Sequence, residues 1–432
     1  MVPFLLKFSS LLRKLAIHQI LFEFLYNKSD MKKHTFLLPI VLLSFSMVVS
    51  SCNQKGESLI SSATSIVSYY SLNEEYEELD LPTPSNEVVN EEDILLAEYD
   101  YHTALQNAYL ASSYDKISSF AKGNKELSKP RPLTIKTGYD SANRYVLKNK
   151  DNDKLVFYGN GGQFDAINLK ADSTYTCECY QGSNLLGNYT FKTENSLPRN
   201  LSVDGVTNVR DLGGYPSLLG GKIRQGLYYR GGRFNYTDEK TTIDQESTFI
   251  NEVTEEGYDT LVNVLKLKSE VDLRMNESHY QGTYAHEYGM MDNSSYPDIE
   301  YAPFPLNWNY SNMMKDEKET IGNIFKFMAV KDNYPMYVHC NIGTDRTGMI
   351  TYILGCLLGI SQLDLYYDYL FSNFANINNT RDLSKITNIY QKTLLGYNEN
   401  NFHNAAFDYL LECGVTDNEI YSIMNIFLDL AA

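Results

Sequence analysis

Residues 339–348 read His-Cys-Asn-Ile-Gly-Thr-Asp-Arg-Thr-Gly, so a cysteine and an arginine are separated by five residues. A loop of this length can curl round a tetrahedral dianion with its main-chain N–H groups pointing inward. The segment 335–339 before it predicts a short buried strand, and the apolar residues 349–354 predict a helix that begins where the loop ends. The pattern therefore requires a strand, an anion-binding loop and a helix in succession.

Two residues of this loop are suited to nucleophilic chemistry. Cys340 is expected beneath a bound phosphorus and at a helix N-terminus, where the macrodipole and unpaired amides lower a thiol pKa and favour the thiolate. Arg346 offers a planar fork of donors to two phosphate oxygens, and Thr347 is expected to hydrogen-bond the sulfur. Gly343 suits a position of positive φ close to the anion. The predicted phosphate-binding residues are Asn341, Ile342, Gly343, Thr344, Asp345 and Arg346.

The loop resembles the signature of cysteine-dependent protein-tyrosine and dual-specificity phosphatases. Its aspartate before the arginine is similar to a bacterial branch that includes phosphoinositide phosphatases, and the segments 207–215 (TNVRDLGGY), 226–230 (GLYYR) and 271–277 (VDLRMNE) resemble that branch too. The resemblance runs from about Asn200 to the C-terminus. It implies an α/β domain, with a central sheet flanked by helices, that hydrolyses phosphomonoesters through a phosphocysteine without a metal or another cofactor.

A general acid is also needed, because the oxygen of a phosphomonoester leaves poorly without a proton. Many relatives carry this acid on a Trp-Pro-Asp loop, but the one tryptophan here, Trp308, is followed by Asn-Tyr. In the bacterial branch the aspartate of the phosphate loop is proposed for the role, which implies Asp345. Asp272 is the alternative, and a structural role at a strand end, holding Arg274 or a loop amide, is equally open for it.

Three other residues are given structural roles. His339 is predicted to hydrogen-bond the loop rather than to act as a base. Arg210 and Asp211 are predicted to form an ion pair that braces the fold, with a place at the substrate mouth as the alternative. None of these residues is needed for attack by a thiolate.

Substrate choice is less constrained by the sequence. Branch members that favour phosphoinositides often carry a lysine where this chain has Thr344, and the chain is acidic, with 37 Lys and Arg against 54 Asp and Glu and a formal charge of −17. Such a field repels polyanions, nucleic acid included, and favours a phosphoprotein or phosphopeptide substrate. A phosphoinositide phosphatase remains the alternative. A second alternative is a non-catalytic surface lipoprotein that binds phosphorylated ligands or adheres to proteins.

The N-terminal residues predict a bacterial signal segment, 1–51, whose true start is Met31. Two lysines follow that methionine, then an apolar run to Val49 and a small-residue pair before Cys52. This arrangement resembles a lipobox, in which Cys52 carries a lipid. We therefore expect a membrane-anchored lipoprotein of the cell envelope, exposed outside the cytoplasm. Residues 52–128 predict a tether, polar up to Asn90, with a helix over 91–112.

Residues 129–197 predict a small all-β sandwich that resembles a fibronectin type III module, as a spacer or, alternatively, a recruitment domain. Cys177 and Cys179 share one face of a strand there, and i,i+2 geometry predicts packed thiols rather than a disulfide. Residues 198–432 predict the phosphatase domain. The expected strands of the module are Leu133–Lys136, Arg144–Leu147, Leu155–Tyr158, Ala166–Leu169, Ser173–Tyr180 and Asn188–Thr193. The expected C-terminal helices are Leu363–Phe374, Leu383–Leu395, Ala405–Leu411 and Asp417–Leu430.

Overall fold

The structure is a computed structural model, and it describes residues 87–429 except 95, 97–99, 113–116, 118–125, 152–153, 235–252, 275–298, 308 and 378. The predicted signal segment, Cys52 and Trp308 lie outside the described residues. Among the helices that are described, none combines the length and the apolar character needed to cross a bilayer.

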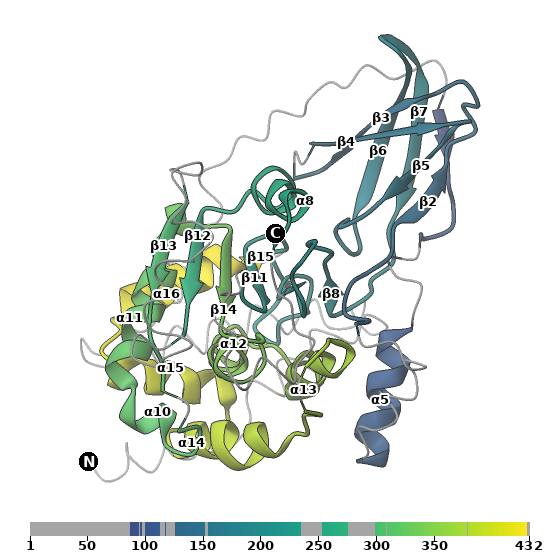
Figure 1. Cartoon of the computed structure of the whole chain (residues 1–432). Helices are drawn as coiled ribbons and strands as arrows, with labels where there is room; N and C mark the ends of the chain where they lie inside the picture. Colours follow the sequence, from purple (N-terminus) through teal and green to yellow (C-terminus); the bar gives the residue numbers. More distant parts are fainter. Residues whose placement is uncertain are drawn as a thin grey trace, which may run out of the picture. The chain divides into compact units, whose positions relative to one another are not determined.

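The β module is one hydrogen-bonded sheet of seven strands in the order β1-β7-β6-β3-β4-β5-β2. Phe164 of β5 stacks on Tyr145 of β3 with ring centroids 4.5 Å apart, although these strands are not neighbours in the sheet. The sheet therefore curls over its own core (Figure 1). Its strands are β1 (Glu87–Val89), β2 (Leu133–Lys136), β3 (Arg144–Asn149), β4 (Lys154–Asn160), β5 (Gln163–Ala166), β6 (Thr174–Gln181) and β7 (Asn184–Lys192).

Five of the six expected strands lie close to their observed positions. The remaining one was expected at Ala166–Leu169 and is observed three residues earlier, as β5 (Gln163–Ala166). Gly161 and Gly162 both have positive φ and form the turn of a tight hairpin, so β5 begins immediately after them. Asn168 then adopts φ +62°, outside the strand region. Cys177 and Cys179 are buried free thiols whose sulfurs lie 3.9 Å apart, which confirms the prediction that they are packed and not bonded.

Helix α5 (Tyr101–Ala111) follows the first strand, with the Asp100 side chain accepting a hydrogen bond from the Thr103 N–H at its N-terminus. The expected helix started ten residues too early, because Ile94 pairs with Thr193 at the end of β7 instead. The ring of Tyr101 packs against Phe371 and Phe374 in the catalytic domain. The helical part of the expected tether is thus packed on that domain.

The catalytic sheet has six strands in the order β13-β12-β14-β11-β9-β8 (Figure 1). The four strands β13, β12, β14 and β11 run parallel, and β9 and β8 continue the sheet antiparallel. Their alternation with helices is the α/β arrangement that the sequence predicted. The strands are β8 (Arg199–Asn200), β9 (Arg210–Asp211), β11 (Tyr228–Gly231), β12 (Ser269–Asp272), β13 (Glu300–Pro303) and β14 (Met336–His339).

Helices bury both faces of this sheet. On one face a core that includes Val271, Val338 and Ile353 is covered by the C-terminal helices. On the other, a core that includes Tyr229, Leu261 and Tyr337 is covered by α8 (Glu255–Asp259) and its continuation Thr260–Val264. The helices that cover the first of these two faces are α10 (Met313–Asp316), α11 (Lys318–Met328), α12 (Asp345–Leu357), α13 (Gln362–Phe371), α14 (Gln391–Leu395), α15 (Phe402–Glu412) and α16 (Asp417–Phe427). Two further strands, β10 (Lys222–Ile223) and β15 (Leu428–Asp429), form a separate antiparallel two-stranded sheet.

Candidate active site

The phosphate loop joins the central strand β14 to the N-terminus of α12, as the sequence predicted. β14 ends at His339, and α12 begins at Asp345 and is buried along its whole length. Gly343 has φ +71°, and a Cβ built there would lie 2.1 Å from the carbonyl oxygen of Gly231. Only glycine therefore permits this approach of the loop to the end of β11.

Cys340 lies at the start of the loop and is 3 % exposed. Burial alone would raise the pKa of its thiol, but the guanidinium of Arg346 and the hydroxyl and main-chain N–H of Thr347 offset this, and the pKa is lowered overall. The Thr347 hydroxyl is buried and makes no hydrogen bond to any of the described residues, so its donor is available to the sulfur. The site therefore favours a thiolate at this sulfur.

Arg346 is held in place from two neighbouring segments. Its Nη1 donates to the carbonyl oxygens of Leu273, 3.1 Å away, and Leu306, 3.2 Å away. Its Nε is buried and has no hydrogen-bond partner within the described part of the chain. The guanidinium is thus oriented by the chain ends beyond β12 and β13 while it retains a donor for an anion in the loop.

A buried cluster of charges supports the back of the loop. The carboxylate of Asp368 on α13 accepts hydrogen bonds from Arg210 Nε at 2.8 Å and from Arg230 Nη1 at 2.5 Å, and the pKa of Asp368 is lowered although burial opposes this. Arg230 Nη2 also donates to the carbonyl oxygen of Gly343 at 2.8 Å. The cluster therefore fixes the loop against β9, β11 and α13.

The predicted pairing of Arg210 with Asp211 is wrong. These neighbours on β9 point to opposite faces of the sheet, as adjacent strand residues must. Arg210 pairs with Asp368, whereas Asp211 accepts from Arg199 Nη1 at 2.6 Å. Both residues are fully buried, so neither lies at a substrate mouth.

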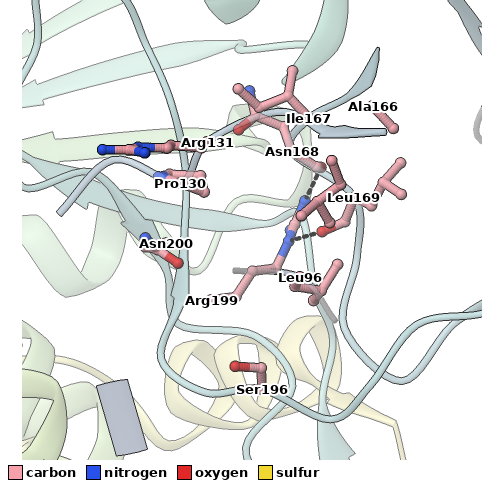
Figure 2. A pocket seen from close by; sticks show the side chains of 11 residues that line it. Leu96, Pro130, Arg131, Ala166, Ile167, Asn168, Leu169, Ser196, Arg199 and Asn200 are labelled. Atoms are coloured by element: carbon pink, nitrogen blue, oxygen red, sulfur yellow. Dashed lines mark hydrogen bonds between the residues drawn. The ribbon is translucent and has the colours of Figure 1, made fainter. Parts of the chain in front are cut away.

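Arg199 also connects the β module to the catalytic domain, beside a small pocket (Figure 2). Its Nε and Nη2 donate to the carbonyl oxygens of Leu169 and Asn168, at 2.9 and 2.8 Å. No residue of the phosphate loop lines this pocket. The contacts are therefore structural and lie apart from the candidate chemistry.

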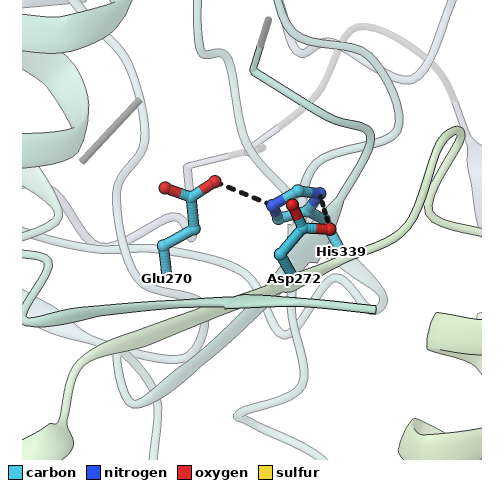
Figure 3. A group of neighbouring side chains, drawn as sticks. All are labelled: Glu270, Asp272 and His339. Carbon is cyan, nitrogen blue, oxygen red and sulfur yellow. Dashed lines mark hydrogen bonds and ion pairs between the residues drawn. The ribbon is translucent and has the colours of Figure 1, made fainter. Parts of the chain in front are cut away.

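His339, Glu270 and Asp272 form a fully buried group under the loop (Figure 3). His339 Nε2 lies 2.8 Å from Glu270 Oε1, and its Nδ1 lies 3.1 Å from the Cys340 carbonyl oxygen. Burial opposes the imidazolium, but Asp272 and Glu270 outweigh it and raise the pKa of His339. The histidine thus joins β12 to the nucleophile's backbone, in line with the expected hydrogen-bonding role.

Asp272 accepts hydrogen bonds from two neighbours. Arg274 donates to it from its main-chain N–H, from Nε and, at 2.6 Å, from Nη2, and the Tyr301 hydroxyl donates at 3.0 Å. Burial would raise the pKa of Asp272, yet Arg274 and His339 lower it to about 2. An aspartate that remains ionised in this way has no proton to give, so the geometry favours its structural role. Glu270, Asp272 and His339 each offer an atom that could bind a metal ion, and these atoms lie within 4.8 Å of one another. In this structure the three side chains hydrogen-bond to protein groups.

Asp345 has a different setting, as the first residue of α12. Its carboxylate accepts from the hydroxyl of Tyr369 at 2.9 Å and pairs with Arg381 Nη2 at 3.2 Å and Lys385 Nζ at 2.8 Å. Burial works to raise the pKa of Asp345, but the two cations lower it overall. In the free protein this group is ionised, and it could act as an acid only after taking up a proton.

Several of these residues could not be recognised in the sequence. Asp368 lies in α13, Lys385 in a later helical turn and Arg381 in the non-helical stretch between them, and they reach the loop only through the packing of those segments. Asn208 belongs to a recognised segment, but its role was missed: Nδ2 donates to the carbonyl oxygen of Ile342 at 2.9 Å. No local pattern signals such contacts.

Several known phosphatases are similar to part of this chain. The chain is 23 % identical over 192 residues to a protein of Cupriavidus necator named as a candidate tyrosine-protein phosphatase, covering 41 % of this chain and 64 % of that protein. The match thus spans a little under two thirds of the relative. A crystal structure of the core catalytic domain of the PP-IP phosphatase Siw14 from S. cerevisiae, in complex with citrate, is 17 % identical with a TM-score of 0.27, covering 43 % of this chain and 94 % of that one.

A second structure of the Siw14 catalytic core is 18 % identical with a TM-score of 0.24, covering 31 % of this chain and 72 % of that chain. The sequence profile described as "Tyrosine phosphatase family" matches residues 201–429, more than half of the chain. That range contains the phosphate loop, the arginine cluster and the histidine group. The chain therefore belongs to the tyrosine phosphatase family.

Proposed function

We propose that this chain hydrolyses phosphomonoesters through a phosphocysteine, with phosphotyrosine in proteins as the main substrate and phosphoserine or phosphothreonine as further ones. One observation carries the proposal: a thiol with a lowered pKa stands at the N-terminus of a buried helix, beside a fixed guanidinium, in a loop shaped for an anion. A protein that only bound phosphorylated ligands would have no use for the thiolate.

The reaction has two steps. The Cys340 thiolate attacks phosphorus, so an S–P bond forms while the P–O bond to the leaving group breaks and the leaving oxygen takes up a proton. Water then attacks the phosphocysteine, the S–P bond breaks, and inorganic phosphate and the thiolate are released. Main-chain N–H groups of the loop and Arg346 stabilise the charge on the equatorial oxygens in both steps.

The depth of the nucleophile supports an aryl phosphate. Cys340 is 3 % exposed, so the phosphorus must enter well below the surface to reach the sulfur. A phenol ring carries its phosphate farther from the peptide main chain than a serine or threonine side chain does. Family membership points the same way.

The experiment is hydrolysis of p-nitrophenyl phosphate and of a phosphotyrosine peptide in the presence of EDTA and a reductant, by the wild type and Cys340→Ser. We expect activity only in the wild type, and an acid-quenched sample should contain one phosphate on the Cys340 peptide by mass spectrometry. Equal activity of the two proteins, or phosphate found elsewhere, would remove the mechanism.

We further propose that the protein is anchored to the bacterial cell envelope through a lipid on Cys52. The basic residues after Met31, the apolar run to Val49 and the small residues before the cysteine support this. Metabolic labelling with an alkyne fatty acid should mark the wild type and not Cys52→Ala. Equal labelling of both proteins would refute the anchor.

A further inference from the structure

The side chain at position 344 cannot contact a substrate. Thr344 is fully buried, and its hydroxyl accepts a hydrogen bond from Asn208 Nδ2 at 3.3 Å. The phosphate loop therefore presents no cation from the position before Asp345. Any positive charge near the substrate besides that of Arg346 must come from outside the loop.

Two cations that pair with Asp345 supply such a charge. Lys385 Nζ lies 2.8 Å from Asp345 Oδ1, and Arg381 Nη2 lies 3.2 Å from Asp345 Oδ2. Two positive groups on one carboxylate leave a local charge of plus one beside the α12 N-terminus. The Lys385 side chain is 27 % exposed, against 13 % for Arg381, so the lysine is the more accessible of the two.

Lys385 also contacts an aromatic ring near the loop. Its ammonium lies 4.0 Å from the centroid of the Tyr310 ring, in a cation–π contact. The phenol of Tyr310 is close enough to Cys340 and Arg346 for their charges to act on its pKa, which burial raises. Lys385 thus contacts both the aspartate of the phosphate loop and the Tyr310 ring.

We propose that Lys385 is an anion subsite next to the phosphate loop, and that it selects phosphotyrosine peptides with a glutamate or aspartate beside the phosphotyrosine. An ammonium has three donors, and Asp345 accepts from one of them, so a substrate carboxylate can bind without displacing Asp345. Asp345 and the ring of Tyr310 hold the lysine in position. This inference rests on the proposed function and defines its substrate class more narrowly.

A single ammonium suits a carboxylate better than a polyphosphate. The chain carries a formal charge of −17, which disfavours the approach of highly charged ligands more than that of a singly charged side chain. The geometry therefore points to acidic phosphopeptides rather than to inositol polyphosphates.

The test compares kcat/KM for two phosphotyrosine peptides that differ only in glutamate or glutamine beside the phosphotyrosine. We expect the wild type to prefer the acidic peptide about tenfold, the effect of one charge-assisted hydrogen bond. Lys385→Met should reduce the preference to about one, whereas Lys385→Arg should retain part of it. Lys392→Met is the matched control, because Lys392 is an exposed lysine on the following helix, and it should keep the full preference.

The ratio between peptides is the readout because Lys385 contacts the loop aspartate, and its substitution therefore also affects the absolute rates for both substrates. An unchanged ratio in Lys385→Met, or an equal loss in Lys392→Met, would overturn the subsite. Wild-type turnover of both peptides without preference would overturn it while leaving the proposed function intact. Failure to hydrolyse either peptide would instead refute the proposed function. Faster, Lys385-dependent hydrolysis of an inositol polyphosphate would overturn the assignment to peptides.

Discussion

The hydroxyl of Ser128 accepts a hydrogen bond from the main-chain N–H of Asn208 at 2.9 Å. Asn208, which adopts φ +63°, in turn donates from Nδ2 to the carbonyl oxygen of Ile342 in the phosphate loop at 2.9 Å. Glu126 extends the chain of contacts by bonding to both Ser128 and the hydroxyl of Thr207. A segment that precedes the family domain by more than seventy residues thereby supports the catalytic loop.

Replacing Ser128 with alanine should lower activity. The buried N–H of Asn208 would lose its acceptor, and we expect kcat for p-nitrophenyl phosphate to fall about tenfold, because small displacements of a catalytic loop are costly. Ser422→Ala is the control, since its hydroxyl also makes one structural hydrogen bond, to the Ala329 carbonyl oxygen, but in another region. If both variants lose stability equally and neither loses kcat, Ser128 does not position the loop.

The sequence predicted those parts of the site that are contiguous in the chain. The strand, loop and helix around Cys340 follow from one local pattern, and their chemistry depends on spacing alone. Asp368, Lys385 and Ser128 act on that loop from distant segments, and their roles depend on tertiary packing. The predicted ion pair of Arg210 with Asp211 was wrong for the same reason. Asp211 is adjacent in sequence, whereas the true partner, Asp368, is brought close only by the packing of α13.

Thr347 should control the pH at which the nucleophile becomes active. Its hydroxyl helps to lower the thiol pKa, so Thr347→Val should raise that pKa and move the acid limb of alkylation of Cys340 by iodoacetamide upward by about half to one pH unit. Thr351→Val is the control, because the Thr351 hydroxyl donates to the Thr347 carbonyl oxygen one turn farther along the helix. A Thr347→Val limb that coincides with the wild type would contradict this role.

Asp345→Asn should affect two kinds of leaving group alike. Because the carboxylate is ionised and held by Arg381 and Lys385, we expect it to act mainly by positioning, with similar losses for p-nitrophenyl phosphate and phosphotyrosine. A general acid would give a different result: a selective loss of about 10²- to 10⁴-fold for phosphotyrosine, whose leaving group needs the proton, and disappearance of the basic limb. That outcome would support the acid role expected from the family.

Asp272 should make folding stability depend on pH. Its pKa falls from 3.8 to about 2 in the folded protein, so its contribution is complete above pH 3.8 and is lost as the pH falls through 2. Asp272→Asn should destabilise the protein at pH 7 by about 3–5 kcal/mol, because buried Arg274 would lose the carboxylate to which it donates hydrogen bonds. Urea unfolding at pH 7, 4 and 3 measures this. A variant as stable as the wild type at pH 7 would refute the assignment.

Gly343→Ala should abolish activity while leaving most of the fold intact. The added Cβ would lie 2.1 Å from the Gly231 carbonyl oxygen at a residue with φ +71°, so the loop must move away from β11 and lose the hydrogen bond from Arg230 to the position 343 carbonyl. We expect loss of turnover together with reduced affinity for vanadate, which occupies phosphate sites. Gly396→Ala, where the nearest contact is 3.1 Å and φ is negative, should retain both. Vanadate binding by Gly343→Ala at wild-type affinity would show that the loop tolerates the methyl group, and the close approach to β11 would then not be what shapes the site.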